Sequence, residues 1–133
     1  MIQNGFLQPA EVAAVMHRSS CYINPSRAEP YGVVLHEAAA AALPILTSHM
    51  VGAAPTLVQD GDNGWWVPGG RADHLAEAMA RVSELDAARL GEFSATSRTI
   101  SRRLSPSGWA RNLHEELDRR TASVRRRSGA RSH

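Results

Sequence analysis

Short apolar runs alternate along the chain with longer segments in which apolar residues recur every three or four positions. The runs are bounded by Pro, Gly, Asn or Asp, as buried strands usually are; they lie at 21–24, 45–46 and 65–67, with a further strand stub at 1–7. The periodic segments predict helices at 9–18, 32–42, 73–85, 87–103 and 106–120, with one helical turn opened by Pro55. This alternation predicts an α/β fold in which helices flank a parallel sheet of three to four short strands.

The stretch 26–48 contains one complete passage from strand end through loop and helix to the next strand. Pro30 disfavours helical conformation at Glu29, so Glu29 is expected in the loop. Residues 32–42 have the composition of a helix, and Pro44 is expected to end it. In such a unit the loop and the helix start lie at the carboxyl edge of the sheet, where open α/β sheets bind their ligands.

The last predicted helix carries a narrow apolar stripe. Trp109, Leu113 and Leu117 recur at four-residue spacing opposite charged residues, so the stripe needs a surface to pack on. The expected organisation is a domain at 1–104, a C-terminal helix at 105–121 and a disordered Arg-rich tail at 122–133. The plain interpretation of the tail is a solvated end, and the sharper one is attraction to an anionic membrane surface. Nucleic acid is not an expected partner, because no aromatic residues are interleaved with the basic run.

Composition restricts the class of protein only moderately. A chain of 133 residues with a formal charge of +2 fits one domain, and all its basic residues are Arg. Cys21 is the single cysteine and cannot form an internal disulfide. The six histidines lack metal-ligand spacing, no apolar run approaches a membrane span, and no signal-peptide order is present. We therefore expect a cytoplasmic protein, with a peripheral contact at the inner face of the membrane as an alternative.

Two carboxylates frame the unit at 26–48. Glu29 precedes the helix and Glu37 lies about a turn and a half into it, so both are expected to face one cleft. The unpaired N–H groups at the helix start, around Gly32 to Leu35, form an anion site suited to phosphate. A carboxylate further along the helix can accept hydrogen bonds from paired sugar hydroxyls. Together these features predict a nucleotide-sugar site.

Glu29 and Glu37, separated by seven residues, resemble the E-x7-E motif of group 1 (family 4) retaining glycosyltransferases with GT-B architecture. The flanking residues agree with that pattern in order: Asn24-Pro25-Ser26, Glu29-Pro30-Tyr31-Gly32, Leu43-Pro44, Gly52, Asp60-Gly61 and Asn63-Gly64. The resemblance covers roughly residues 5–85, with a weaker echo around Trp109. It implies a partial Rossmann-like sheet from the C-terminal, donor-binding half of such an enzyme. The acceptor-side domain and the first βαβ units of the donor-side domain have no counterpart in the 133 residues.

The resemblance also implies roles for individual residues. Glu29 would lie next to the donor sugar, where a carboxylate orients and stabilises a developing oxocarbenium ion, and Glu37 would bind the nucleotide ribose. The main-chain N–H groups of Tyr31, Gly32 and Val33 would reach the sugar and the diphosphate, and Ser26 and Arg27 would help to hold phosphate. The plain alternatives are a solvated loop for Glu29, an exposed helix face for Glu37 and an ordinary helix start between them.

Departures from the family pattern leave a second hypothesis open. Ala42 stands where the family commonly has Gly, and Ala53 and Thr56 replace the second Gly and the Glu of a Gly-Gly-x-Pro-Glu loop. The first hypothesis is the donor side of a metal-independent transferase without a bound cofactor. It moves a sugar from a nucleoside diphosphate sugar to an unknown glycan or lipid-linked acceptor, together with a separate acceptor-side domain. The second is a non-catalytic interaction module that uses the C-terminal helix and the basic tail.

Overall fold

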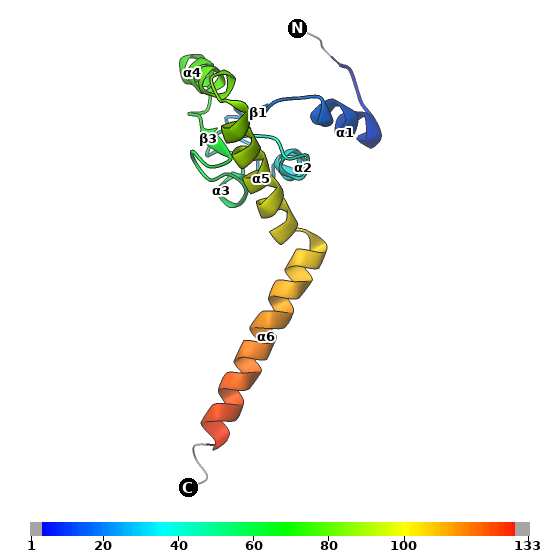
Figure 1. The fold of residues 1–133 in the computed structure, drawn as a ribbon, viewed down its shortest axis with the longest axis vertical. Coiled ribbons are helices and arrows are strands. Elements are labelled where there is room, and N and C mark those ends of the chain that lie inside the picture. The colour runs from blue at the N-terminus through cyan, green and yellow to red at the C-terminus, as the bar shows by residue number, and fades with distance from the viewer. Residues whose placement is uncertain (1–3, 130–133) are drawn as a thin grey trace. The chain divides into compact units, whose positions relative to one another are not determined.

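The computed structural model describes residues 4–129, and its contacts divide the chain into two units, Met1–Ser101 and Arg102–His133. The first unit is built on a three-stranded parallel sheet in the order β1-β2-β3 (Figure 1). The strands are β1 (Tyr22–Asn24), β2 (Ile45–Thr47) and β3 (Gly64–Trp66). The predicted α/β class and its parallel sheet are confirmed, with three strands among the described residues.

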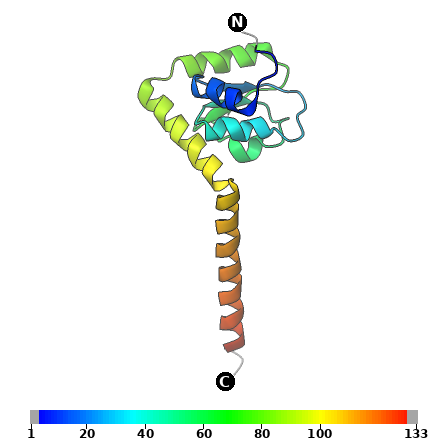
Figure 2. The same cartoon turned by 90° about the vertical axis from the view of Figure 1, so that its right-hand side faces the viewer.

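Helices cover both faces of this sheet. They are α1 (Pro9–His17), α2 (Val33–Ala40), α3 (Ala54–Leu57), α4 (Ala72–Ser83) and α5 (Ala87–Arg103). The central strand β2 is buried on both sides: Ile45 belongs to the core under α1, α2 and α3, and Leu46 belongs to a second core under α4. Successive strand residues point to opposite faces, which explains why this apolar run lacks alternation. Figure 2 shows α1 and α2 on the same side of the sheet.

A buried hydrogen-bond network joins the entrance of β3 to α5. The Asn63 side chain donates from Nδ2 to the carbonyl of Leu57 at 2.9 Å and to Oγ of Ser97 at 3.1 Å. Its Oδ1 accepts the main-chain N–H of Gln59 at 2.7 Å, and Ser97 Oγ donates to the carbonyl of Leu43 at 2.7 Å. These pairs satisfy the polar groups of both buried side chains, which holds α5 against the sheet.

Helix α2 ends at Ala40, before the predicted residue 42, and main-chain hydrogen bonds end it. The N–H of Leu43 bonds to the carbonyl of Ala38, and the N–H of Ala42 to that of Ala39, which is a Schellman motif. Ala42 occupies its left-handed position with φ 61°. The prediction that Pro44 ends the helix is therefore wrong, because the chain has already left the helix at Ala40.

Two further expectations differ from the structure. The strand stub at 1–7 is wrong for residues 4–7, which form no strand, and residues 1–3 lie outside the described residues. The C-terminal helix α6 (Pro106–Gly129) continues through 122–129, where a disordered tail was expected; 130–133 lie outside the described residues. Within residues 4–129, no helix combines the length and apolar character needed to cross a bilayer.

The second unit consists mainly of α6. Ser105 begins it: its Oγ accepts the main-chain N–H of Gly108 at 3.1 Å, as a helix N-cap does. The three residues of the predicted stripe are all exposed, with fractions of 65% for Trp109, 43% for Leu113 and 52% for Leu117. The apolar face that the sequence predicts is thus present on this helix.

Candidate functional site

Three loops meet at the carboxyl edge of the sheet, one after each strand. The loop after β1 is joined to the loop after β2 through Glu29, whose N–H donates to the carbonyl of Met50 at 3.0 Å. The carbonyl of Glu29 accepts the N–H of Gly52 at 2.8 Å. Gly52 has no space for a side chain, since a Cβ would lie 2.0 Å from the carbonyl oxygen of Pro30. These contacts fix the main chain of Glu29 at the sheet edge.

The carboxylate of Glu29 is turned back towards the start of α2. Its Oε1 accepts the main-chain N–H of Tyr31 at 3.3 Å and that of Gly32 at 3.1 Å. The side chain is half-buried, so the plain interpretation as a fully solvated loop carboxylate does not describe it. One carboxylate oxygen is used to hold the loop, and Oε2 has no hydrogen-bond partner among the described residues.

The start of α2 retains two free amide groups. Gly32 is its N-cap at φ 70°, and a Cβ there would lie 2.4 Å from a methyl group of Val51. The amides of Tyr31 and Gly32, expected to reach the ligand, instead donate to Glu29. The N–H groups of Val33 and Val34 have no partner among the described residues. These two amides are therefore what the helix start offers to an anion.

Ser26 and Arg27 belong to the loop after β1. The exposed guanidinium of Arg27 rests against Gly70, where a Cβ would come within 2.5 Å of Nε. The carbonyl of Ser26 accepts a hydrogen bond from Oγ of Ser48. Its N–H donates to Oδ1 of Asn24 at 3.3 Å. Ser26 thus has a structural task in joining two loops, whereas Arg27 presents a positive charge at the edge of the sheet.

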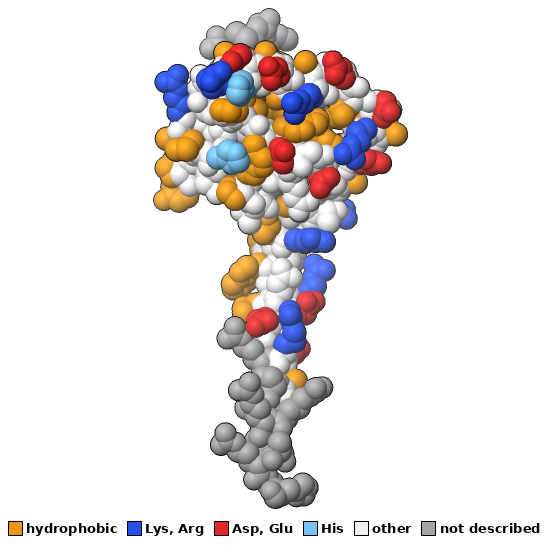
Figure 3. Space-filling model, turned by 90° about the vertical axis from the view of Figure 1, so that its left-hand side faces the viewer, with side chains coloured by type: hydrophobic (Ala, Val, Ile, Leu, Met, Phe, Trp, Pro, Cys, Tyr) orange, Lys and Arg blue, Asp and Glu red, His pale blue; other side chains and the backbone are white. Residues whose placement is uncertain are grey.

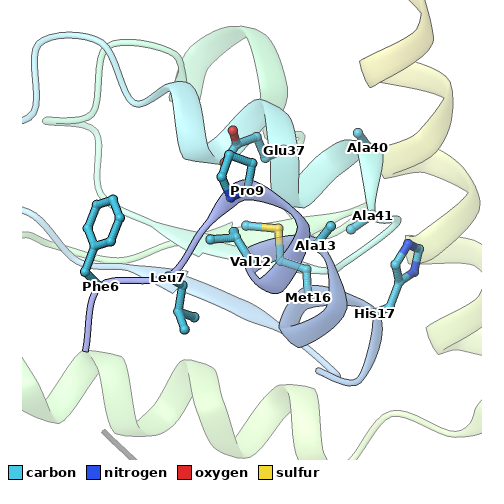
Figure 4. A pocket seen from close by; sticks show the side chains of 10 residues that line it. All are labelled: Phe6, Leu7, Pro9, Val12, Ala13, Met16, His17, Glu37, Ala40 and Ala41. Atoms are coloured by element: carbon cyan, nitrogen blue, oxygen red, sulfur yellow. The ribbon is translucent and has the colours of Figure 1, made fainter. Parts of the chain in front are cut away.

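Glu37 faces a cavity that the sequence did not predict. The cavity has a volume of about 480 Å³, and Figure 4 shows its lining side chains from the N-terminal segment, α1 and α2. Except for Glu37 and His17 the lining is apolar: Phe6, Leu7, Pro9, Val12, Ala13, Met16, Ala40 and Ala41. Phe6 and Leu7, which belong to the predicted strand stub, instead line this cavity. A signal for this role is present in the sequence. Phe6 and Leu7 stand three and two positions before Pro9, which opens α1, so two large apolar side chains lie next to the start of a helix.

Tyr22, the first residue of β1, has a shifted pKa. Burial raises the pKa of Tyr22, a hydrogen bond with Asn24 opposes that rise, and the negative charges of Glu37 and Glu29 raise it further. A charge shifts a pKa appreciably only over a short range. Glu37 lines the cavity and Glu29 does not, so the expectation that both face one cleft stays a prediction.

Two aromatic side chains stack between the loop after β2 and the end of β3. His49, in the loop after β2, stacks on Trp66 at 4.3 Å between ring centroids and 11° between planes. The N–H of Trp66 donates to Oδ1 of Asp60 at 3.0 Å. Among residues 4–129, His, Cys, Asp and Glu side chains form no group of three that could hold a metal ion.

The sequence and the fold both match known glycosyltransferases. Residues 3–96 match the family described as Glycosyl transferases group 1. Glycogen synthases from two strains of Mycobacterium tuberculosis, CDC 1551 / Oshkosh and H37Rv, are each 39% identical to the chain over 54 residues. These residues cover 41% of this chain and 13% of either synthase.

Two solved structures share the fold. Sucrose-phosphate synthase from Thermosynechococcus elongatus matches with a TM-score of 0.71 and 24% identity, over 91% of this chain and 30% of that one. HepE from Anabaena, solved in complex with UDP and glucose, matches with a TM-score of 0.67 and 22% identity, over 82% of this chain and 30% of that one. The likeness confirms the GT-B type of fold, and the chain spans about a third or less of these relatives. Because the family match covers most of the chain and includes both Glu29 and Glu37, this protein belongs to the group 1 glycosyltransferase family.

Proposed function

We propose that this chain is the donor-side part of a retaining glycosyltransferase and binds a nucleoside diphosphate sugar. The observation that carries the proposal is the position of Glu37, one turn beyond the free amides of Val33 and Val34 and at the mouth of an apolar cavity. A bound nucleotide needs three neighbouring features, in the order of its own parts. These are an apolar pocket for the base, a hydrogen-bond acceptor for the ribose hydroxyls and an anion site for the phosphates.

Each part of the ligand has a matching part of the site. The base enters the cavity between α1 and α2, and the Glu37 carboxylate accepts hydrogen bonds from the ribose hydroxyls. The diphosphate lies at the amides of Val33 and Val34, with the guanidinium of Arg27 adding positive charge. The sugar then lies next to Glu29. The cavity volume of about 480 Å³ is in the range of small-molecule sites.

The chemistry proposed for this arrangement is transfer with retention and without a metal ion. As the bond between sugar and diphosphate breaks, positive charge develops on the sugar ring and negative charge on the leaving phosphate. The Glu29 carboxylate, whose Oε1 is held by two main-chain N–H groups, stabilises the first charge through Oε2. The amides of Val33 and Val34 and the Arg27 guanidinium stabilise the second.

Sugar transfer requires a second domain that faces the donor site. Exposed side chains such as Tyr31 and Val33 leave the proposed donor site accessible to water, and a single domain cannot hold an acceptor against the donor sugar and exclude that water. The relatives that match are three to eight times longer than the matched part of this chain. We propose that a separate acceptor-side domain completes the site and binds a glycan or lipid-linked acceptor.

Calorimetric titration of the chain with UDP, GDP and ADP tests the binding half of this proposal. We expect one of the three nucleotides to saturate the protein and Glu37→Gln to weaken that binding about tenfold or more, as the loss of a charged hydrogen bond does. Glu77→Gln is the matched control, because Glu77 is an exposed glutamate on α4 remote from the cavity. Equal affinities of wild type and Glu37→Gln would remove Glu37 from the site. A folded chain that binds none of the three nucleotides would favour the non-catalytic interaction module instead.

A further inference from the structure

Helix α6 carries an apolar face that nothing in the proposed donor site uses. Trp109, Leu113 and Leu117 follow one another at four-residue spacing, and each step of four residues rotates about 40° around a helix. The three side chains thus share an arc of about 80°. All three remain exposed, which is uncommon for a Trp and two Leu residues on one face.

Charged residues occupy the opposite side of the same helix. Arg111, Glu115, Asp118 and Arg119 are exposed there, and the same spacing argument places them away from the apolar face. In Figure 3 hydrophobic side chains gather along one edge of α6 and charged ones mostly along the other. The helix is therefore amphipathic, with a narrow apolar face and a wide polar one.

The charge of α6 is uneven along its length. Its sequence contains six Arg against three acidic residues, and residues 119–129 contain five Arg and neither Asp nor Glu. Every basic residue is Arg, whose planar guanidinium pairs with phosphate oxygens through two hydrogen bonds. The half of the helix that follows the apolar face thus has an excess of positive charge that its own sequence does not compensate.

We propose that α6 is an interfacial helix that docks on an anionic lipid surface. Trp109, Leu113 and Leu117 enter the boundary between headgroups and acyl chains, and the Arg residues bind lipid phosphates. A tryptophan at this depth is favoured, because its ring is apolar while its N–H stays near water. The docking would tether the chain to a membrane surface.

A helical protein partner fits these observations less well. A paired helix needs an apolar seam that continues at heptad spacing. Arg120 and Thr121 stand three and four positions after Leu117, and Val124 stands seven after it, so a charged residue interrupts the seam and a single apolar residue follows in it. The Arg-rich half therefore offers a partner helix little apolar surface, and a protein partner would have to match that positive charge separately. A lipid surface supplies the apolar layer and the negative charge together.

Cosedimentation of the full chain with vesicles tests this proposal. We expect binding to phosphatidylcholine vesicles that contain phosphatidylglycerol, little binding to pure phosphatidylcholine, and weakening as salt is raised. The double variant Leu113→Gln/Leu117→Gln should reduce the partition coefficient about tenfold or more while circular dichroism stays helical, since Gln has nearly the helix propensity of Leu. Met79→Gln is the control, because Met79 is 48% exposed on the first unit.

Fluorescence locates the contact. Addition of anionic vesicles should shift the tryptophan emission to shorter wavelength, and Trp109→Phe should abolish most of the shift while retaining binding, which would exclude Trp65 and Trp66 as its source. Unchanged vesicle binding by the double Gln variant would overturn the proposal. Equal binding to both kinds of vesicle, or no binding to either, would also overturn it. A wild-type chain that is dimeric in solution, together with a monomeric double Gln variant, would show instead that the apolar face binds a second copy.

Discussion

The Oε1 atom of Glu29 accepts a hydrogen bond from the main-chain N–H of Gly32 at 3.1 Å, so the carboxylate closes the loop that leads into α2. The same oxygen also accepts the N–H of Tyr31. The proposed catalytic group is thereby held by the chain segment whose remaining amides would bind the donor phosphate. The Glu29 side chain therefore both holds the loop before α2 and, in the proposed function, acts on the donor sugar.

Replacing Glu29 separates these two roles. Glu29→Ala removes the acceptor of both N–H groups and should lower the free energy of unfolding by about 1–2 kcal/mol, whereas Glu29→Gln keeps an oxygen at Oε1 and should cost less. Urea denaturation of both variants measures the difference. In an enzyme reassembled with its acceptor side, Glu29→Gln should lose transfer while still binding nucleotide. An Ala variant as stable as wild type would contradict the structural role.

Gly70 tests the position of Arg27. Its φ is 77°, and a Cβ would lie 2.5 Å from Nε of Arg27, so Gly70→Ala should both strain the backbone and displace the guanidinium. Gly61→Ala is a matched control: its φ is 79°, but a Cβ there meets nothing within 4 Å. Both variants should lose about 1 kcal/mol of stability. Only Gly70→Ala should weaken nucleotide binding in calorimetry, and equal affinities in the two variants would exclude Arg27 from the phosphate site.

The same substitution at two other glycines should have opposite effects on stability. In Gly52→Ala the Cβ would lie 2.0 Å from the Pro30 carbonyl oxygen, so the two loops must separate and the loss should exceed about 2 kcal/mol. Gly91 lies within α5 with open space around it, and Gly91→Ala should add about 0.5–1 kcal/mol through helix propensity. Thermal and urea unfolding measure both values. A neutral Gly52→Ala would mean that the loop contact is looser than the structure has it.

Cys21 should react slowly as long as the chain is folded. Burial raises the pKa of its thiol from 9.0 to about 11, opposed by a hydrogen bond from the main chain of Leu46. The reactive species is the thiolate, so alkylation near pH 8 should be about 100-fold slower in the folded chain than in the urea-unfolded chain. Equal rates would show that the thiol is not buried.

The same shift links stability to pH. The folded state holds the Cys21 proton more tightly than the unfolded state, so this contribution is complete below pH 9.0 and is lost as the pH rises through about 11. Denaturant unfolding across that range should therefore show a decline that is less steep in Cys21→Ala. The pKa of Tyr22 is also raised by burial, so part of the decline remains in the variant.

Several elements could be predicted because their signals are local. The apolar runs around Ile23, Ile45 and Trp65 gave three parallel strands, and the periodicity between them gave the helices. Pro9 and Pro106 open helices that begin at those residues, since proline fits the first turn. Ala42, which stands where the family commonly has Gly, has a left-handed φ of 61°. At such a position Ala costs about 1 kcal/mol relative to Gly.

The site was only partly predictable, because its amides and its cavity depend on contacts between segments. The sequence placed Glu29 before the helix but could not show that its carboxylate takes the amides of Tyr31 and Gly32, which leaves Val33 and Val34 for an anion. Nor could it show that Phe6 and Leu7 line a cavity with Glu37, since no periodic pattern links an irregular segment to a helix about thirty residues later.

The sequence by itself determined the order of strands and helices, the family and the apolar face of α6, because each of these is written in spacing along the chain. Only the tertiary structure decided which groups are free to bind a ligand. That outcome depends on which donors and acceptors become paired when the three loops meet at the sheet edge, and a polar group already paired within the protein has little left to offer a ligand.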